Sequence, residues 1–267
     1  MNLKSFLNNI VDSLKTTTSI TNAVKKMRWL YSKGTNTGNK HTIIGFKYLS
    51  PIGEIDLLVR SNRGSDAFII SEVFGQQCYF IPLKNEIDCI LDLGANAGYT
   101  AVYYSKLFPK ANIACVEPMP NNIDVLKKNL TMNCVNAVIF EGAVSVADGK
   151  ISMEIGDLDY GNKVHDIPFG RNMNNGLLVT EGFSLNTIIE KLLWHKIDLL
   201  KIDIEGYEGV LLHQNNSWLA KVGTIIIEIH EGITIETVRK ATDAFGFIHI
   251  QQKKGNWILS KQPIEIT

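Results

Sequence analysis

The stretch over residues 90–100 constrains the fold more than any other part of the sequence. A short apolar run ends in Asp92, and a segment punctuated by Gly94 and Gly98 follows it. Residues 100–107 then have the pattern of a helix. A strand, a glycine-containing loop and a helix in this order let a ligand approach the backbone and leave free N–H groups at the helix start. The stretch therefore predicts a site for a polar small molecule.

The loop differs from the dinucleotide fingerprint at its centre. That fingerprint requires a second glycine where this chain has Asn96. Asp92 precedes the loop, and its carboxylate would repel a pyrophosphate but would suit a cation. S-adenosylmethionine carries a sulfonium and an ammonium and has no phosphate, so the charge at Asp92 favours this cofactor over NAD. The alternative is a tight turn in which Asp92 caps the helix and no ligand binds.

The composition excludes several classes of protein. The chain has 267 residues, of which 45% are hydrophobic and 20% charged, and its formal net charge is zero. A neutral chain gives no electrostatic case for nucleic acid as a partner. No stretch has the length of a membrane span, and residues 1–14 lack the apolar core of a signal peptide. Four cysteines are scattered without C-x-x-C spacing, which predicts reduced thiols in a cytoplasmic protein: Cys78, Cys89, Cys115 and Cys134.

The first 83 residues are expected to form two small units before the main domain. Residues 1–40 contain an amphipathic helix over residues 2–15 and a basic helix over residues 23–31, joined to the rest by a loop at 34–39. These helices would either meet a partner or a membrane surface or brace the main domain, and their polar face favours the brace. Residues 41–83 predict a small β-rich cap. Its strands are expected at 42–48, 55–59 and 78–82, and a helix at 65–74.

Residues 84–267 alternate strand and helix patterns, which predicts a doubly wound sheet. The fold class is therefore α/β, a Rossmann-like, mostly parallel seven-stranded sheet whose last strand is antiparallel, with the N-terminal helical and β cap. Strands are expected at 89–93, 112–117, 137–141, 199–204, 224–229, 247–251 and 257–260, and helices at 100–107, 120–132, 185–194, 208–213 and 235–245. Residues 151–182 break the alternation, and this Gly- and Asn-rich insertion predicts either a binding loop or a solvated β-hairpin extension.

Two strand ends carry residues that suit an adenosine cofactor. Glu117 ends the second strand about 20 residues past the glycine loop, where an acid accepts hydrogen bonds from both ribose hydroxyls. Pro118 follows it and would border the adenine. Glu141 and Ala143 end the third strand, where the adenine edge would lie. A surface carboxylate without a ligand is the alternative for Glu141.

The fourth and fifth strands bring acids, a lysine and a histidine to the same edge of the sheet. Lys201 and Asp203 share a face of the fourth strand, and Glu205 joins them if the strand continues. His230, which follows Glu228 on the fifth strand, is the best candidate base by its intrinsic pKa, with Asp203 as the group that orients it or binds substrate. A capping role for Asp203 and a purely structural role for His230 are the alternatives. The acids and His230 could also collect a divalent cation, but the spacing does not demand one and no metal is expected.

Taken together, these motifs resemble the FkbM family of S-adenosylmethionine-dependent methyltransferases. The resemblance covers roughly residues 60–235 and is specific in the combination of DLGANAG at 92–98 with KIDIEGYE at 201–208. It implies a class I methyltransferase fold and methyl transfer, usually to a hydroxyl oxygen. It places Asp92, Gly94, Asn96, Gly98 and Glu117 on cofactor positions. The further cofactor-binding residues expected with it are Asp66, Tyr99, Thr100, Pro118, Glu141 and Ala143.

The sequence therefore predicts a methyltransferase that uses S-adenosylmethionine and acts on a hydroxyl of a sugar, glycan, peptide or other natural product. The expected catalytic residues are Asp203, His230, Glu205 and Lys201. Methylation of a peptide, amide or amine nitrogen is the nearest alternative. Two alternatives of other classes are a nicotinamide-dependent oxidoreductase and a non-catalytic binding module. The expected partners are the acceptor molecule and a second copy of the chain in a homodimer, without nucleic acid or integral membrane contact.

Overall fold

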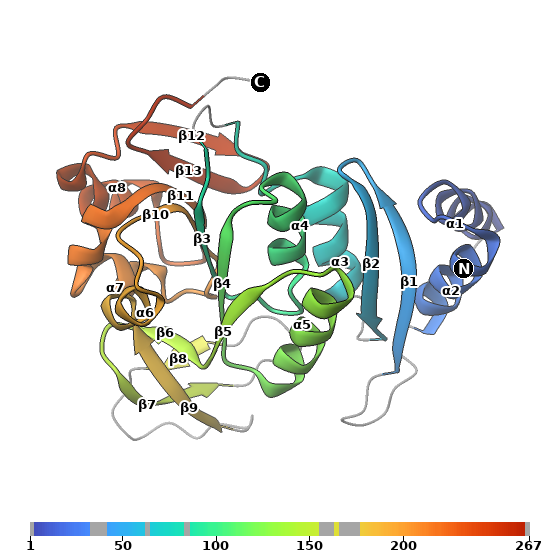
Figure 1. Ribbon diagram of the computed structural model, residues 1–267, viewed down its shortest axis with the longest axis horizontal. Coiled ribbons are helices and arrows are strands. Elements are labelled where there is room, and N and C mark those ends of the chain that lie inside the picture. The colour runs from blue at the N-terminus through green and yellow to red at the C-terminus, as the bar shows by residue number, and fades with distance from the viewer. Residues whose placement is uncertain are drawn as a thin grey trace.

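A seven-stranded sheet forms the centre of the molecule (Figure 1). The computed structural model describes residues 3–32, 42–61, 65–82, 86–154, 163–165 and 177–264. All neighbouring strands of the sheet are parallel except β13, which is antiparallel to both of its neighbours. This order confirms the predicted fold class. From one edge to the other the strands are β12 (His249–Lys253), β13 (Asn256–Ser260), β11 (Val222–Glu228), β10 (Ile197–Ile202), β3 (Cys89–Leu93), β4 (Asn112–Glu117) and β5 (Ala137–Glu141).

The sheet is covered on both faces, which is why its inner strands β11, β10, β3 and β4 are mainly apolar. Alternate residues of β3 belong to different cores: Ile90 packs into one cluster and Leu91 and Leu93 into the other. One face is covered by α4 (Tyr99–Leu107) and α5 (Pro120–Met132). The other face is covered by α6 (Leu185–Leu192), α7 (Glu208–His213), the 3-10 helix η2 (Asn216–Lys221) and α8 (Ile235–Thr242), which η3 (Asp243–Phe245) extends.

The fourth strand, expected at residues 199–204, lies two residues earlier in the structure. β10 begins at Ile197 and ends at Ile202, so Asp203 and Glu205 lie in the following turn and not on the strand. Glu205 and Gly206 both have positive φ, 56° and 100°, which turns the chain sharply into α7. The expectation that Asp203 shares a strand face with Lys201 is therefore wrong, and the strand does not continue to Glu205, although the turn still brings these residues to one edge of the sheet.

The N-terminal part packs beside the α4–α5 face (Figure 1). The helices α1 (Leu3–Lys15) and α2 (Ile20–Ser32) and the hairpin of β1 (Ile43–Ser50) with β2 (Gly53–Arg60) confirm four predicted elements. The hairpin is joined to α5 by side-chain amides: Asn129 Oδ1 accepts from Leu58 N at 2.8 Å and Asn133 Oδ1 accepts from Asp56 N at 3.1 Å. The predicted loop at 34–39 lies outside the described residues.

The segment after the hairpin corrects two expectations. The predicted helix over residues 65–74 is an α-helix, α3 (Ser65–Ile70), that continues as a π-helix, η1 (Ser71–Gln76). Residues 78–82, predicted as a strand, form a turn and an irregular segment without a strand partner. Gln77 in the left-handed conformation ends η1 and directs this segment inward, where Tyr79 and Ile81 are buried in the core. The apolar pattern that predicted a strand is explained by this burial.

The insertion after β5 forms a second, four-stranded sheet, in the order β6-β9-β7-β8. An antiparallel pair of strands at its centre supports the hairpin alternative for residues 151–182. Residues 155–162 and 166–176 of this insertion lie outside the described residues. The strands are β6 (Ala143–Ser145), β7 (Gly149–Glu154), β8 (Lys163–His165) and β9 (Leu177–Ser184).

Two further expectations concern the whole chain. All four cysteines are free, as their spacing predicted. Among the described residues, the helices are too short or too polar for any of them to cross a lipid bilayer.

Candidate functional site

A cavity of about 320 Å³ opens at the carboxyl ends of β3, β4, β10 and β11. Ligands of open α/β sheets bind at this edge, because the loops that follow the strands can be shaped without disturbing the sheet. Its walls come from α3 and η1, the glycine loop, the end of β4, the insertion and the turns after β10 and β11. Its lining includes Glu72, Tyr79, Gly94, Asn96, Tyr99, Thr100, Glu117, Pro118, Asn122, Ala143, Met153, Lys201, Asp203, Glu205, Glu228 and His230.

The glycines of the loop are required by the protein's own packing. Gly94 and Gly98 have positive φ, 76° and 83°. A Cβ on Gly94 would lie 1.9 Å from the carbonyl oxygen of Asp203, and one on Gly98 would lie 2.6 Å from Leu126 Cδ1. Side chains are excluded at both positions, because the loop is pressed against the end of β10 on one side and α5 on the other. Gly94 lines the cavity, whereas Gly98 holds the loop against α5.

Glu117 is fixed in the cavity wall by three donors. Its Oε2 accepts from Asn96 N at 2.8 Å, and its Oε1 accepts from Met119 N at 2.9 Å and from Asn122 Nδ2 at 3.0 Å. Burial raises the pKa of this carboxyl, and the three hydrogen bonds act in the opposite direction. A carboxylate offers about four acceptor sites, and these three donors leave about one, on Oε2, for a hydroxyl group of a ligand.

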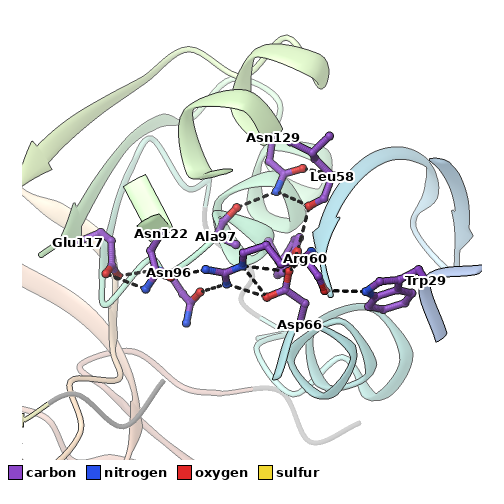
Figure 2. Close-up of polar contacts among 10 residues, drawn as sticks. Trp29, Leu58, Arg60, Asp66, Asn96, Ala97, Glu117, Asn122 and Asn129 are labelled. Atoms are coloured by element: carbon purple, nitrogen blue, oxygen red, sulfur yellow. Dashed lines mark hydrogen bonds and ion pairs between the residues drawn. The ribbon is translucent and has the colours of Figure 1, made fainter. Parts of the chain in front are cut away.

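A buried arginine connects Glu117 to the N-terminal hairpin (Figure 2). Arg60, at the end of β2, forms an ion pair with Asp66 at 2.6 Å and donates to Oδ1 of both Asn96 and Asn122. Because a guanidinium has only donors, both amides must turn their oxygen towards it. The Nδ2 of Asn122 is thereby directed to Glu117. Asp66, predicted to bind cofactor, is fully buried behind the wall, where it also accepts from Tyr99 OH.

The charge of Asp92 is compensated inside the protein. Asp92 is fully buried and does not line the cavity, and its Oδ1 lies 3.1 Å from Lys201 Nζ. Lys201 also donates to Gly94 O at 2.8 Å and lies 3.4 Å from Asp203 Oδ2. Burial disfavours the charge on Lys201, but the two carboxylates outweigh burial and raise its pKa. The attraction for a cation that the sequence assigned to Asp92 is therefore taken up by Lys201, and the acidity that a ligand would meet comes from other residues.

His230 is held between carboxylates at the cavity surface. Its Nδ1 lies 2.8 Å from Oε1 of the buried Glu208, and its Nε2 lies 3.3 Å from Glu205 Oε2 and 3.9 Å from Asp203 Oδ1. Burial lowers the pKa of His230, but the hydrogen bond to Glu208 and the charges of Glu208, Asp203 and Glu205 prevail and raise it to about 9. The imidazole is oriented by Glu208 and is mostly protonated at neutral pH.

Three more polar residues complete this end of the cavity. Tyr79 donates its hydroxyl to Asp203 Oδ2 at 3.1 Å, which leaves Oδ1 of Asp203 facing His230. Burial, followed by repulsion from Asp203, raises the pKa of Glu228 to about 7, and the same two causes raise the pKa of Glu72. The three carboxyl groups therefore lie close enough to oppose one another's ionisation.

The structure brings most of the predicted site residues together. Of the predicted catalytic set, Lys201, Asp203, Glu205 and His230 all line the cavity. Glu141 lies outside it as a half-exposed carboxylate paired with Lys127 at 2.5 Å. Asp92, Gly98 and Asp66 lie behind the wall, where they support residues that face the cavity. The predicted cofactor-binding residues in the wall are Gly94, Asn96, Tyr99, Thr100, Glu117, Pro118 and Ala143.

The site also contains residues that sequence reasoning missed. Glu208 was part of the KIDIEGYE motif, and its position at the start of a helix was a usable signal. Glu72, Tyr79 and Arg60 gave no such signal, because they reach the site through the π-helix, an irregular segment and the hairpin.

Three of these groups have the geometry of a cation site. One ligand atom from each of Asp203, Glu205 and His230 lies within 4.8 Å of the others. The donor set of two carboxylates and an imidazole suits a divalent metal. The same atoms already form the ion pair between His230 and Glu205 described above.

The sequence of this chain is similar to those of known methyltransferases. The sequence model of the methyltransferase FkbM domain matches residues 92–249. The hexuronic acid methyltransferase AglP of Haloferax volcanii is 28% identical over 155 residues, which are 58% of this chain and 61% of that protein. The methyltransferase sdnD of Sordaria araneosa is 39% identical over 66 residues, 25% of this chain and 26% of that protein. The matches thus span less than two thirds of each relative. The solved structure of the methyltransferase FkbM from Methylobacillus flagellatus is also similar. The match covers 67% of this chain and 44% of that protein, with 12% identity and a TM-score of 0.47.

Proposed function

This chain belongs to the FkbM methyltransferase family, and from that premise we propose that it transfers a methyl group from S-adenosylmethionine to a hydroxyl oxygen of a sugar, glycan, peptide or other natural product. The observation that carries the proposal is that one cavity is lined both by residues expected to bind the cofactor and by residues expected to act on the acceptor. The cavity has a fixed carboxylate, Glu117, at the end of β4 and an oriented histidine, His230, after β11.

The cavity suits S-adenosylmethionine in size and chemistry. Its volume of about 320 Å³ lies in the range of small-molecule sites. Glu117 would accept a hydrogen bond from a ribose hydroxyl at its remaining acceptor site, since its carboxylate is already oriented by Asn96, Met119 and Asn122. Glu72, Asp203, Glu205 and Glu228 line the remaining wall, and their charge would favour a sulfonium. S-adenosylmethionine supplies a methyl carbon activated by its positively charged sulfur.

The protein's own residues would align the acceptor and remove its proton. His230 Nε2 faces the cavity and is the atom that would take the hydroxyl proton. Glu208 fixes the ring through Nδ1 and would stabilise the imidazolium that forms. Asp203, held by Tyr79, would accept a hydrogen bond from the acceptor and fix the direction of attack. Because His230 has a pKa near 9, a neutral imidazole must first be generated by loss of a proton to solvent.

The proposal is tested by binding and by turnover. We expect S-adenosylmethionine to raise the melting temperature and NAD to leave it unchanged. The enzyme, incubated with labelled methyl donor and a cell extract, should give a labelled product in which the methyl group is bound to oxygen. Label on nitrogen would replace the hydroxyl acceptor by an amine or amide. Binding of NAD in place of S-adenosylmethionine would contradict the proposal.

A further inference from the structure

The cavity wall that would face the acceptor carries an excess of negative charge. Glu72 comes from η1, Asp203 and Glu205 from the turn after β10, and Glu228 from the end of β11. The basic lining residues among those the structure describes are Lys201 and His230. Carboxylates thus predominate at the edge of the cavity that lies across from Glu117.

Both basic residues are already engaged by carboxylates. Lys201 is 2% exposed and lies between Asp92 at 3.1 Å and Asp203 at 3.4 Å. His230 lies between Glu208 at 2.8 Å and Glu205 at 3.3 Å. Arg60 is nearby but forms its ion pair with Asp66 behind the wall. Neither lining cation is therefore available to a carboxylate on an incoming acceptor.

The acids of this wall already oppose one another. Burial, and then the charge of Asp203, raise the pKa of Glu72 and raise that of Glu228 to about 7, so Glu228 is only partly ionised at pH 7 and the other acids of the wall carry most of its charge. S-adenosylmethionine has a net charge of +1, from a sulfonium, an ammonium and a carboxylate, and offsets only part of this field. A further anion would be repelled, since like charges held a few ångströms apart near a protein surface oppose one another. Neutral hydroxyls and ammonium groups, in contrast, would find acceptors and counter-charges.

We infer that the methyl acceptor is a neutral or positively charged polyhydroxyl compound, such as a neutral or amino sugar, and not a uronic acid. The inference rests on the proposed function and narrows its substrate class. The relative from Haloferax volcanii is named for a hexuronic acid, which is an anion. The chain would therefore share the reaction of that relative and differ from it in the charge of the acceptor.

The first experiment identifies the charge of the natural acceptor. The enzyme is incubated with labelled S-adenosylmethionine and an extract of the cells from which it comes, the product is hydrolysed to its smallest labelled unit, and that unit is separated by electrophoresis at pH 7. A neutral or cationic labelled unit is expected. A labelled unit that carries a carboxylate, or a methyl ester of one, overturns the inference while leaving the methyltransferase assignment intact. Absence of label despite cofactor binding overturns the proposed function and this inference with it.

The second experiment changes the charge of the wall. Two acceptors that have the same sugar ring but differ in charge are compared, methyl glucoside and methyl glucuronide. The extract fractions that carry the label are assayed in the same way. The variant Glu72→Lys should raise the ratio of anionic to neutral product roughly tenfold or more, and Glu72→Gln should raise it less. Glu190→Lys, on the exposed surface of α6, changes the net charge of the protein equally and serves as the control. An unchanged ratio in both Glu72 variants would contradict the inference.

Discussion

Oε1 of Glu208 lies 2.8 Å from Nδ1 of His230, and this contact directs the opposite nitrogen of the ring to the cavity. Glu208 is completely buried, so its charge acts on the imidazole with little screening by water. The same Oε1 accepts from the backbone N–H groups of Ile204 and Gly206 at 3.2 Å. One carboxylate therefore holds both the base and the turn that carries Asp203 and Glu205.

Replacing Glu208 by Gln should lower turnover without abolishing cofactor binding. Glutamine keeps an acceptor oxygen for Nδ1 and for the turn but removes the charge that stabilises the imidazolium. We expect kcat to fall by about 10–100-fold, less than the roughly 100–10,000-fold that a general base itself contributes, while the thermal shift with S-adenosylmethionine is kept. Glu231→Gln changes an exposed neighbour of His230 and should leave both quantities unchanged. Wild-type turnover in Glu208→Gln would remove His230 from its assigned role.

The pH dependence of the reaction should report the titration of His230. The base must be neutral to take a proton, and its pKa of about 9 lies above the usual value, so kcat/KM should rise from pH 7 through pH 9 and level off only above that pH. Glu208→Gln lowers this pKa and should move the rise to lower pH. A steady-state profile of both proteins measures the shift. A merely structural role of Glu208 would lower the rate at every pH without moving the profile.

Glu117 and Glu141 end the neighbouring strands β4 and β5, but only Glu117 lies in the cavity wall. Variants of the two residues should therefore differ in their affinity for the cofactor. Glu117→Gln places its amide protons opposite either the N–H of Asn96 or the N–H of Met119 and removes the charge, and we expect affinity for S-adenosylmethionine to fall tenfold or more, since hydrogen bonds to charged groups contribute about 1.5–3 kcal/mol. Glu141→Gln should bind like the wild type, because that carboxylate is half exposed and lies outside the cavity. Calorimetric titration of both variants tests the difference. Equal affinities would show that Glu117 does not contact the cofactor.

Arg60 should matter for stability as well as for the site. Arg60→Met removes the guanidinium that pairs with the fully buried Asp66, and removing one member of a buried ion pair costs about 3–5 kcal/mol. Chemical denaturation should show this loss, and Arg239→Met, at an exposed position of α8, should show none. A stability equal to that of the wild type would mean that Asp66 finds another partner or becomes protonated.

Much of this fold could be predicted from local pattern. The apolar runs of β3, β4 and β5 and the residues of α5 follow from periodicity alone, because each element is buried on the face that its sequence marks. The position of the glycine loop could also be predicted, but the reason why Gly94 and Gly98 must be glycines could not. The sequence suggested that Gly94 and Gly98 make room for a ligand, whereas the contacts with Asp203 and Leu126 show that they make room for the protein itself.

The electrostatics of the site could not be predicted, because they depend on contacts between distant segments. Asp92 and Lys201 are 109 positions apart in the sequence and pair across adjacent strands, so the charge that the sequence assigned to the cofactor is compensated within the sheet. His230 had the right intrinsic pKa for a base in isolation. Three carboxylates from the turn after β10 and from α7 change that value, and their arrangement follows from the left-handed residue Glu205, which no periodic pattern indicates.

The hydrogen bonds between the hairpin and Asn129 and Asn133 of α5 mean that the hairpin cannot be removed without exposing polar groups of α5. The stretch matched by the family ends at residue 249 and begins at residue 92. A polypeptide cut to those limits would lose β13, which pairs with β11, and would leave the two asparagines of α5 without the strand they hold. The segment that the family model matches is therefore smaller than the unit that these contacts hold together. A protein truncated to residues 92–249 should aggregate.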